Sequence, residues 1–257
     1  MGNDLLQDSL EIPAAYELSV LEKTDNLRQH IQNLARNGAQ EGTIVWAKKQ
    51  NDFSGYFGEN WICNEDDFYC GLILQPEFQR DRYAEINFVA ALALGNAIAA
   101  YLSPMTALAF HWPNRLMIAN HRIAGIWLDA GQDNQDQPYL TVTASCNVRY
   151  SPDDFQLPAM SIHEAEGGTE LNAETLFCEF SREFVKQINS WDDKGFEHTF
   201  RQWKNRAEGI DQKINLATQD NAAARLIQFT PQGGIEVELP EQGRIGINVM
   251  DQLQLSD

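Results

Sequence analysis

The sequence predicts an α+β fold in which helices pack on a mixed sheet and a small β unit follows at the C-terminal end. Apolar residues recur at helical spacing in residues 27–34 and 176–188. Over 140–148 they alternate with polar residues, which is typical of a strand. Near the C-terminus, the runs 225–230 and 235–239 flank a Pro-Gln-Gly-Gly turn, which indicates a hairpin. This order of elements, without an internal repeat, favours α+β.

The first half of the chain is expected to contain two helices and two strands. Residues 1–17 include Pro13 and little periodicity, so they favour an extended lead-in. Thr24 is placed to cap the first helix, and Gly38 to end it. The elements that follow are a strand at 43–48, a loop rich in Asn, Asp and Gly at 50–67, a strand at 69–74 and a long apolar helix at 83–102.

The second half begins with strands and ends with strands. The expected elements are strands at 108–112, 116–118 and 122–129, a half-buried strand at 140–148, helices at 176–188 and 196–207, and strands at 225–230, 235–239 and 245–249. A shift in composition over 210–221 predicts a main domain of residues 1–209 and a small β domain of residues 210–257. About 40 residues cannot form an independent core, so the small domain should lean on the main one.

Composition excludes several classes of protein. The formal net charge is −18, from 19 Lys and Arg against 37 Asp and Glu, and such a field repels nucleic-acid backbones and anionic lipid. No apolar run reaches the ~18 residues of a membrane span, and the N-terminus lacks a signal-peptide pattern. Four scattered cysteines favour reduced thiols. We therefore expect a cytoplasmic protein that binds neither nucleic acid nor membrane.

No metal site is expected. The five histidines lack ligand spacing, although His111 and His121 could approach each other across a hairpin. The acidic run 65–67 favours a coat on a surface loop, because a calcium loop needs a longer alternation of oxygen ligands. A phosphate-binding Gly-x-x-x-x-Gly-Lys motif and a serine nucleophile elbow are also absent from the sequence.

Two motifs carry the functional information. Residues 50–61 read QNDFSGYFGENW, and residues 110–126 read FHWPNRLMIANHRIAGI. In order and spacing they resemble the signature of the biotin/lipoate protein ligase family, which has Gly-Arg-Gly-Arg-Arg-Gly-Arg-x-Trp after a Gln, and Lys-Trp-Pro-Asn-Asp before Lys-Leu/Ile-Ala-Gly-Ile. The resemblance spans residues 16–207, and the C-terminal unit resembles the family's small SH3-like domain. It implies an acyl-adenylate made from biotin and ATP, and acyl transfer to a carrier-protein lysine.

Positions that match the family are candidates for ligand binding. These are Gln50, Gly55, Gly58, Trp61, Trp112, Asn114, Arg122, Gly125 and Asn147. Other interpretations stay open: Trp112 to Asn114 would form a turn, Gly125 would allow close strand packing, and Asn147 would lie on the exposed face of its strand. Arg122 stands at the position of the family's lysine, which holds biotin and the adenylate phosphate.

The charged residues of both motifs differ from the family. The arginines that would clamp carboxylate and phosphate oxygens are replaced by Ser54, Tyr56, Phe57 and Glu59. Arg115 stands where the family has an Asp. A glutamate in a phosphate clamp opposes ATP binding, and apolar rings in place of arginines would fill the phosphate pocket.

These substitutions leave three hypotheses open. The first is a ligase-like protein with a rebuilt, non-adenylating site that binds a small acyl or heterocyclic ligand, or a carrier protein. The second is an active enzyme, either a divergent biotin/lipoate ligase that uses Arg122 or an acyltransferase with Cys146 as nucleophile. ATP and biotin or lipoate are implied only if the family's chemistry is retained. The alternation places Cys146 on an apolar face, which favours a buried, inert thiol. The third hypothesis is a structural subunit that docks a basic partner.

Overall fold

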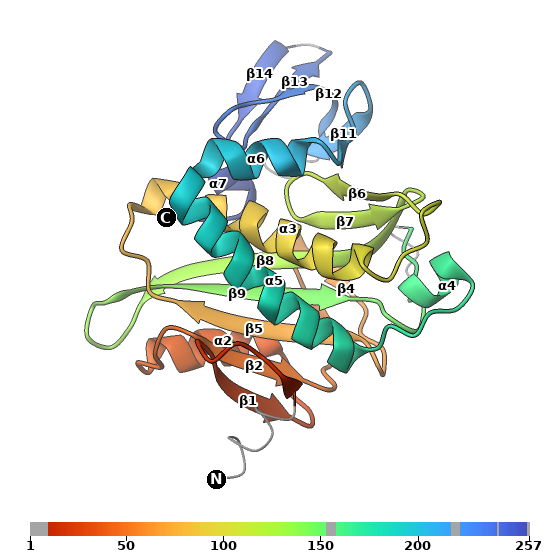
Figure 1. The fold of residues 1–257 in the computed structure, drawn as a ribbon. Coiled ribbons are helices and arrows are strands. Elements are labelled where there is room, and N and C mark those ends of the chain that lie inside the picture. Colours follow the sequence, from red (N-terminus) through yellow and green to blue (C-terminus); the bar gives the residue numbers. More distant parts are fainter. Residues whose placement is uncertain (1–9, 153–157, 217–221, 241, 256–257) are drawn as a thin grey trace.

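The α+β fold is confirmed in the computed structural model, which describes residues 10–152, 158–216, 222–240 and 242–255 (Figure 1). One large sheet contains β1 (Glu17–Leu21), β2 (Thr43–Ala47), β5 (Phe68–Leu74), β6 (Leu108–His111), β7 (Arg115–Ile118), β8 (His121–Gln132), β9 (Pro138–Cys146) and β10 (Ala207–Glu208). Its strand order is β1-β2-β5-β9-β8-β7-β6-β10. The sheet is mixed, because β1 runs parallel to β2 and β10 parallel to β6, while the strands between them are antiparallel.

Helices cover both faces of this sheet. The helices α3 (Glu85–Ala99) and α5 (Ala173–Lys194) pack on each other and on one face, and α6 (Phe196–Lys204) follows them. The shorter α2 (Leu27–Arg36) packs on β5, β9 and β8. The two sides are separate in Figure 1, with α5 in front of the strands and α2 behind β2 and β5. The other short helices are α4 (Ile162–Glu166), η2 (Arg80–Arg82) and α7 (Val249–Gln252). None of the helices in the described ranges is long and apolar enough to cross a membrane.

The expectation of a half-buried β9 is wrong. Val142, Ala144 and Cys146 are buried, as predicted for the apolar face, but Thr141, Thr143 and Ser145 are also at most 1% exposed. Alternation identifies the residues that share a face without revealing whether that face meets solvent. Here α2 covers the second face. Asn147, just beyond the end of this strand, is buried as well, against the Arg122 and Met160 carbonyls.

Two local predictions near the N-terminus change, and one holds. The run expected as an extended lead-in ends in strand β1, which pairs with β2. The helix α2 is capped by Asn26, whose side chain accepts a hydrogen bond from the Gln29 N–H at 3.0 Å, and not by Thr24. Gly38, with φ of 84°, follows the end of the helix as expected.

Asp67 does not coat a surface loop, as the acidic run suggested. It is fully buried, and its carboxylate accepts hydrogen bonds from the backbone N–H groups of Val148, at 2.9 Å, and Asn64, at 3.1 Å. Burial raises the pKa of this carboxyl group to about 7. Asp67 therefore joins the segment before β5 to the chain that leaves β9.

The C-terminal sheet contains β11 (Lys213–Leu216), β12 (Ala222–Phe229), β13 (Ile235–Leu239) and β14 (Gly243–Ile247), all antiparallel. It rests on α6 and the end of the large sheet (Figure 1). Phe229 meets Trp203 of α6 edge to face with ring centroids 5.2 Å apart, and the indole N–H of Trp112 donates to the Gly233 carbonyl at 2.8 Å. The small sheet therefore leans on the larger unit, while the division into domains at 209/210 stays a prediction.

Candidate functional site

The glycine-rich segment 50–61 folds back on itself against the sheet face that α2 covers. The strands β3 (Phe53–Ser54) and β4 (Asn60–Trp61) form a ribbon around the 3₁₀ turn η1 (Tyr56–Gly58). The Gly55 N–H closes the turn by donating to the Glu59 carbonyl at 2.7 Å. Gly58 has a φ of 76°, a left-handed conformation that favours glycine. Gly55 and Gly58, which match the family signature, therefore shape the turn that contains Tyr56, Phe57 and Glu59, the residues that differ from it.

An aromatic cluster, formed by Phe53, Trp61 and Trp127, lies under this turn. The rings of Trp61 and Trp127 meet edge to face with centroids 5.1 Å apart, and Phe53 meets Trp127 at 4.9 Å. A Cβ atom at Gly125 would lie 2.7 Å from Trp127 Cη2, and one at Gly55 would lie 2.7 Å from Trp127 Nε1. Both glycines therefore provide the room that Trp127 occupies.

An ion cluster of Glu59, Arg115 and Arg122 lies beside the aromatic cluster. The two carboxylate oxygens of Glu59 accept from Arg115 Nη2 and Arg122 Nη1, each at 2.6 Å. The Arg122 side chain is only 3% exposed, and its guanidinium carbon lies 4.4 Å from the centroid of the Trp61 ring. A buried guanidinium requires a compensating charge, and Glu59 supplies it.

A second ion pair lies where α2 meets β8. Arg28 binds Asp129 through two hydrogen bonds of 2.7 Å, and its guanidinium lies 5.0 Å from the Tyr56 ring. The Tyr56 hydroxyl donates to the Leu128 carbonyl at 3.0 Å and accepts from the Leu128 N–H at 2.6 Å. The Tyr56 hydroxyl therefore pairs the backbone N–H and carbonyl of Leu128, in the part of β8 that extends beyond its pairing with β7. No local sequence signal could link Arg28 to Asp129, because the two lie 101 residues apart.

Three polar side-chain atoms on this face, Trp61 Nε1, Thr143 Oγ1 and Ser145 Oγ, are buried without a hydrogen-bond partner in the described part of the chain. Thr143 lies opposite Trp127, and Ser145 opposite Gly125, across the β8–β9 pair. Buried polar groups are normally paired, so these three atoms are unusual within the described part of the chain. Thr143 and Ser145 escaped the sequence prediction because their face was taken as solvent-exposed.

The structure brings together four of the nine predicted ligand-binding positions around the two clusters: Gly55, Trp61, Arg122 and Gly125. Gly58 lies in the turn just before Glu59. Gln50 Oε1 accepts from the Leu27 N–H at 3.0 Å and so fixes the start of α2. The side chain of Phe57 lies outside the described part of the structure.

The other three predicted positions make structural hydrogen bonds. Trp112 donates to the C-terminal sheet, as described above. The Asn114 side-chain amide donates to the Ile126 carbonyl at 2.8 Å, beside the end of β7. The Asn147 amide donates to the Met160 carbonyl at 3.2 Å and so holds the segment before α4. Asn147 is 1% exposed, so the alternative that placed it on an exposed strand face is wrong. A ligand-binding role for these three positions stays a prediction.

Cys146 lies on the opposite face of the sheet from both clusters. It is fully buried, and burial raises the pKa of its thiol well above the ordinary value, which opposes thiolate formation. His121 sits in the exposed turn between β7 and β8, where its Nδ1 is 2.8 Å from the Ala119 carbonyl oxygen. Over the described ranges, no three His, Cys, Asp or Glu side chains are grouped to hold a metal ion.

Comparison with known proteins agrees with this fold and identifies the family. The sequence model described as the biotin/lipoate A/B protein ligase family matches residues 60–205. The chain is 26% identical over 204 residues to a biotin--[acetyl-CoA-carboxylase] ligase of Paracoccus denitrificans, a match that covers 77% of this chain and 84% of that protein. It is 27% identical over 194 residues to the bifunctional ligase/repressor BirA of Bacillus spizizenii, covering 72% of this chain and 58% of that protein.

Solved structures show the same fold at low sequence identity. A biotin protein ligase-like protein of unknown function from Silicibacter sp. superposes with a TM-score of 0.75 at 20% identity, covering 94% of this chain and 97% of that one. The Aquifex aeolicus biotin protein ligase in complex with biotin and ATP superposes with a TM-score of 0.73 at 18% identity, covering 90% and 95%.

Proposed function

This chain belongs to the biotin/lipoate A/B protein ligase family, and we propose that it is a member that binds a small acyl or heterocyclic ligand without forming an acyl-adenylate. The observation that carries the proposal is the position of the Glu59 carboxylate, which lies 2.6 Å from both Arg115 and Arg122. The cations that remain in the motifs are therefore bound to an internal anion.

Electrostatics support the absence of adenylate chemistry. Arg28, Arg115 and Arg122 contribute +3, and Asp129 and Glu59 contribute −2, so these five groups sum to +1. A triphosphate requires several fixed cations, and it would have to displace the Glu59 carboxylate to reach Arg122. The residues present therefore do not fit ATP, and the chain's net charge of −18 adds to the repulsion.

The same face retains the features of a site for a small, mainly apolar ligand. Aromatic walls come from Phe53, Trp61 and Trp127. The indole N–H of Trp61 and the hydroxyls of Thr143 and Ser145 provide a few polar atoms within them. Ligand sites commonly combine apolar walls with a small number of placed polar groups. A neutral ring, or an acyl chain with one polar end, fits this combination.

The first test is pyrophosphate exchange into ATP with biotin or lipoate as the acid. We expect no exchange above a protein-free control, whereas the Paracoccus denitrificans relative serves as the positive control. Exchange by the wild-type protein would overturn the proposal. It would favour the alternative of a divergent ligase, in which the Arg122 guanidinium serves in place of the lysine.

Ligand binding is tested separately by thermal shift with biotin, lipoate and octanoate, because a ligand that binds the native state raises the melting temperature. Trp61→Phe keeps an apolar ring and removes the N–H, so it should weaken binding by about tenfold, the worth of one buried hydrogen bond. Trp112→Phe removes an indole N–H that lies outside the site and should leave the affinity unchanged. A response to none of the three acids would refute the ligand assignment.

We also propose a carrier-type protein as partner and the cytoplasm as location. The relative from Paracoccus denitrificans is named for its action on acetyl-CoA carboxylase, and the four cysteines here are free thiols. Pull-down with a biotin-carrier domain as bait tests the first point, and the failure of the carrier domain to retain the protein would count against it. A basic, unrelated bait of similar size controls for attraction to the acidic surface.

A further inference from the structure

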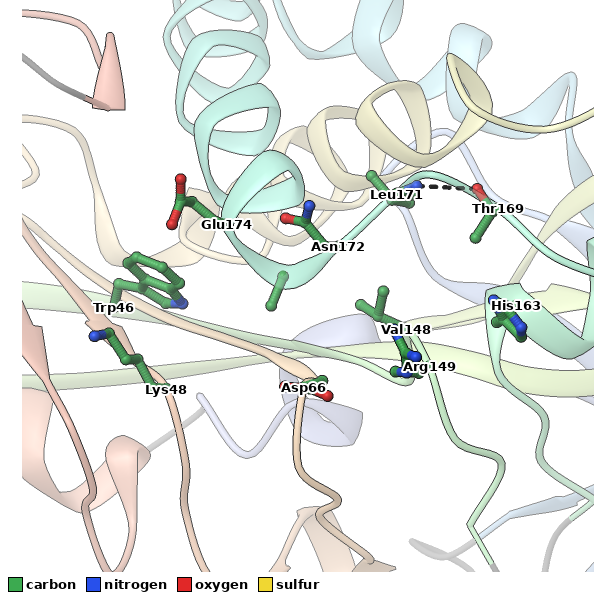
Figure 2. A pocket seen from close by; sticks show the side chains of 11 residues that line it. Trp46, Lys48, Asp66, Val148, Arg149, His163, Thr169, Leu171, Asn172 and Glu174 are labelled. Carbon is green, nitrogen blue, oxygen red and sulfur yellow. Dashed lines mark hydrogen bonds between the residues drawn. The ribbon is translucent and has the colours of Figure 1, made fainter.

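A cavity of about 340 Å³ lies on the face of the sheet opposite the ion and aromatic clusters (Figure 2). Its walls come from β2, the segment that leaves β9, α4, and the N-terminal end of α5. Sites for small ligands commonly enclose about 300 to 1,000 Å³, so the cavity is large enough for a small metabolite. It shares no lining residue with the site described above.

Trp46 of β2 provides the first indication of a ligand. Its side chain stacks on Phe177 of α5 with ring centroids 5.3 Å apart, and the residue is 5% exposed. Its Nε1 is buried and has no acceptor among the residues that the structure describes. Figure 2 shows this nitrogen facing the cavity. A buried N–H without an acceptor costs stability, which a bound acceptor would restore.

The N-terminus of α5 and Arg149 add two positive features to the same cavity. The helix is 22 residues long, and its N-terminal end carries the positive end of the helix dipole. The Asn172 side chain caps the Thr175 N–H at 2.8 Å, which leaves the first backbone N–H groups of the helix at the cavity. The exposed Arg149 makes no ion pair within the described ranges, so its guanidinium can meet a carboxylate.

Carboxylates line the cavity as well. Asp66 and Glu174 are exposed side chains on its rim, on the loop before β5 and on the first turn of α5. A purely anionic ligand would be repelled by them. A purely cationic ligand would be repelled by Arg149, by the helix N-terminus and by Lys48, which also lines the cavity and pairs with Glu22. A ligand with both a carboxylate and an ammonium group can pair with the positive groups and with the carboxylates of the cavity. Val148 and Leu171 complete the lining with apolar surface.

We propose that this cavity binds a small zwitterion of the α-amino acid class with an apolar side chain. The carboxylate accepts hydrogen bonds from Trp46 Nε1–H and from Arg149 at the α5 N-terminus. The ammonium group meets the carboxylate of Asp66, and the side chain packs against Val148 and Leu171. Because the cavity lies on the other face of the sheet, this proposal does not rest on the proposed function.

The test follows the indole N–H resonance of Trp46 in ¹⁵N-labelled full-length protein during titration with L-leucine. The resonance is assigned by its loss in Trp46→Phe. We expect a saturable shift of this resonance with millimolar affinity, in the range of weak metabolite binding at about −4 kcal/mol. Two matched probes each lack one charge: 4-methylpentanoate has no ammonium group, and 3-methylbutylamine has no carboxylate. Both should bind at least about tenfold more weakly, since each loses a charged hydrogen-bonding partner.

Two variants complete the test. Arg149→Gln should weaken L-leucine binding by about tenfold, because it removes the charge-assisted contact. Arg244→Gln changes an exposed arginine on β14, far along the chain from the cavity lining, and should leave the affinity unchanged. The proposal would be overturned by a Trp46 resonance that does not respond to L-leucine, or by equal binding of 4-methylpentanoate. An unchanged affinity in Arg149→Gln would overturn the assigned carboxylate position.

Discussion

Replacing Glu59 by glutamine should destabilise the fold and remove the carboxylate that Arg115 and Arg122 share. Glu59 holds Arg115 and Arg122 at 2.6 Å each, and the Arg122 side chain is 3% exposed. The substitution keeps the size of the side chain and one acceptor oxygen. It removes the negative charge that compensates the buried guanidinium.

The expected loss can be worked from the burial of the three side chains. Removing one partner of a fully buried ion pair costs about 3 to 5 kcal/mol. Glu59 is 27% exposed and the substituted amide would keep one hydrogen bond, so we reduce this to ~2 kcal/mol. For a chain of this size, each kcal/mol corresponds to about 2 to 4 °C in Tm. The Tm of Glu59→Gln should therefore fall by ~4 to 8 °C.

A matched control is available in the same region of the sequence. Glu65→Gln breaks an ion pair of 2.5 Å with Lys49, but both side chains are exposed, so Tm should not change. Thermal unfolding followed by circular dichroism measures both variants. Equal Tm values for Glu59→Gln and the wild type would refute the buried ion cluster. A gain in pyrophosphate binding by Glu59→Gln, and not by Glu65→Gln, would support the inference that the Glu59 carboxylate neutralises Arg115 and Arg122.

Two substitutions, a pH titration and a labelling experiment test individual contacts and buried groups. Tyr56→Phe should lower the unfolding free energy by ~2 kcal/mol in urea denaturation, because it strands the buried N–H and carbonyl of Leu128; no change would contradict that role. Trp127→Ala should cost about 3 to 5 kcal/mol through the cavity that it opens, and a loss under ~1 kcal/mol would mean that the cluster is loosely packed. The folded-state pKa of Asp67, about 7, lies above its ordinary value of 3.8, so its contribution to stability is full below pH 4 and is lost as pH rises through 7. Urea denaturation at a series of pH values should show this fall in the unfolding free energy. A dependence of the unfolding free energy on pH equal to that of Asp67→Asn would count against it. Cys146 should resist maleimide in the native protein at neutral pH, and labelling as fast as in urea would show an accessible thiol.

The long periodic elements were predictable from sequence, and so were several short strands such as β7 and β13, but β1, β10 and β11 were not. The stripe of α5 and the alternation of β9 extend over enough residues to define a period. The strands β1, β10 and β11 have five, two and four residues, too few for a period to show. Thr24 and Asn26 are both good cap residues, and the choice of Asn26 depends on tertiary contacts such as that of Gln50 with Leu27.

The candidate site was predictable as far as its motifs extend. Matching positions located Trp61, Arg122 and Gly125, which do lie together. The partners of Glu59 are 56 and 63 residues away along the chain, so no local pattern indicates the ion cluster. Thr143 and Ser145 were missed for a different reason. A period of two assigns residues to faces, but only packing decides whether α2 or solvent covers a face.

The two charge changes in the motifs compensate each other in space. Glu59 stands where the resembled signature has an arginine, and Arg115 stands where it has an aspartate, so each position carries the opposite charge. Either change alone would leave a like charge or an unpaired ion next to Arg122, at a cost of several kcal/mol (about 3 to 5) if buried. Together they form a 2.6 Å ion pair, and Glu59 also satisfies Arg122. Independent loss of site residues would not be expected to produce such a match, which supports the proposal of a rebuilt site.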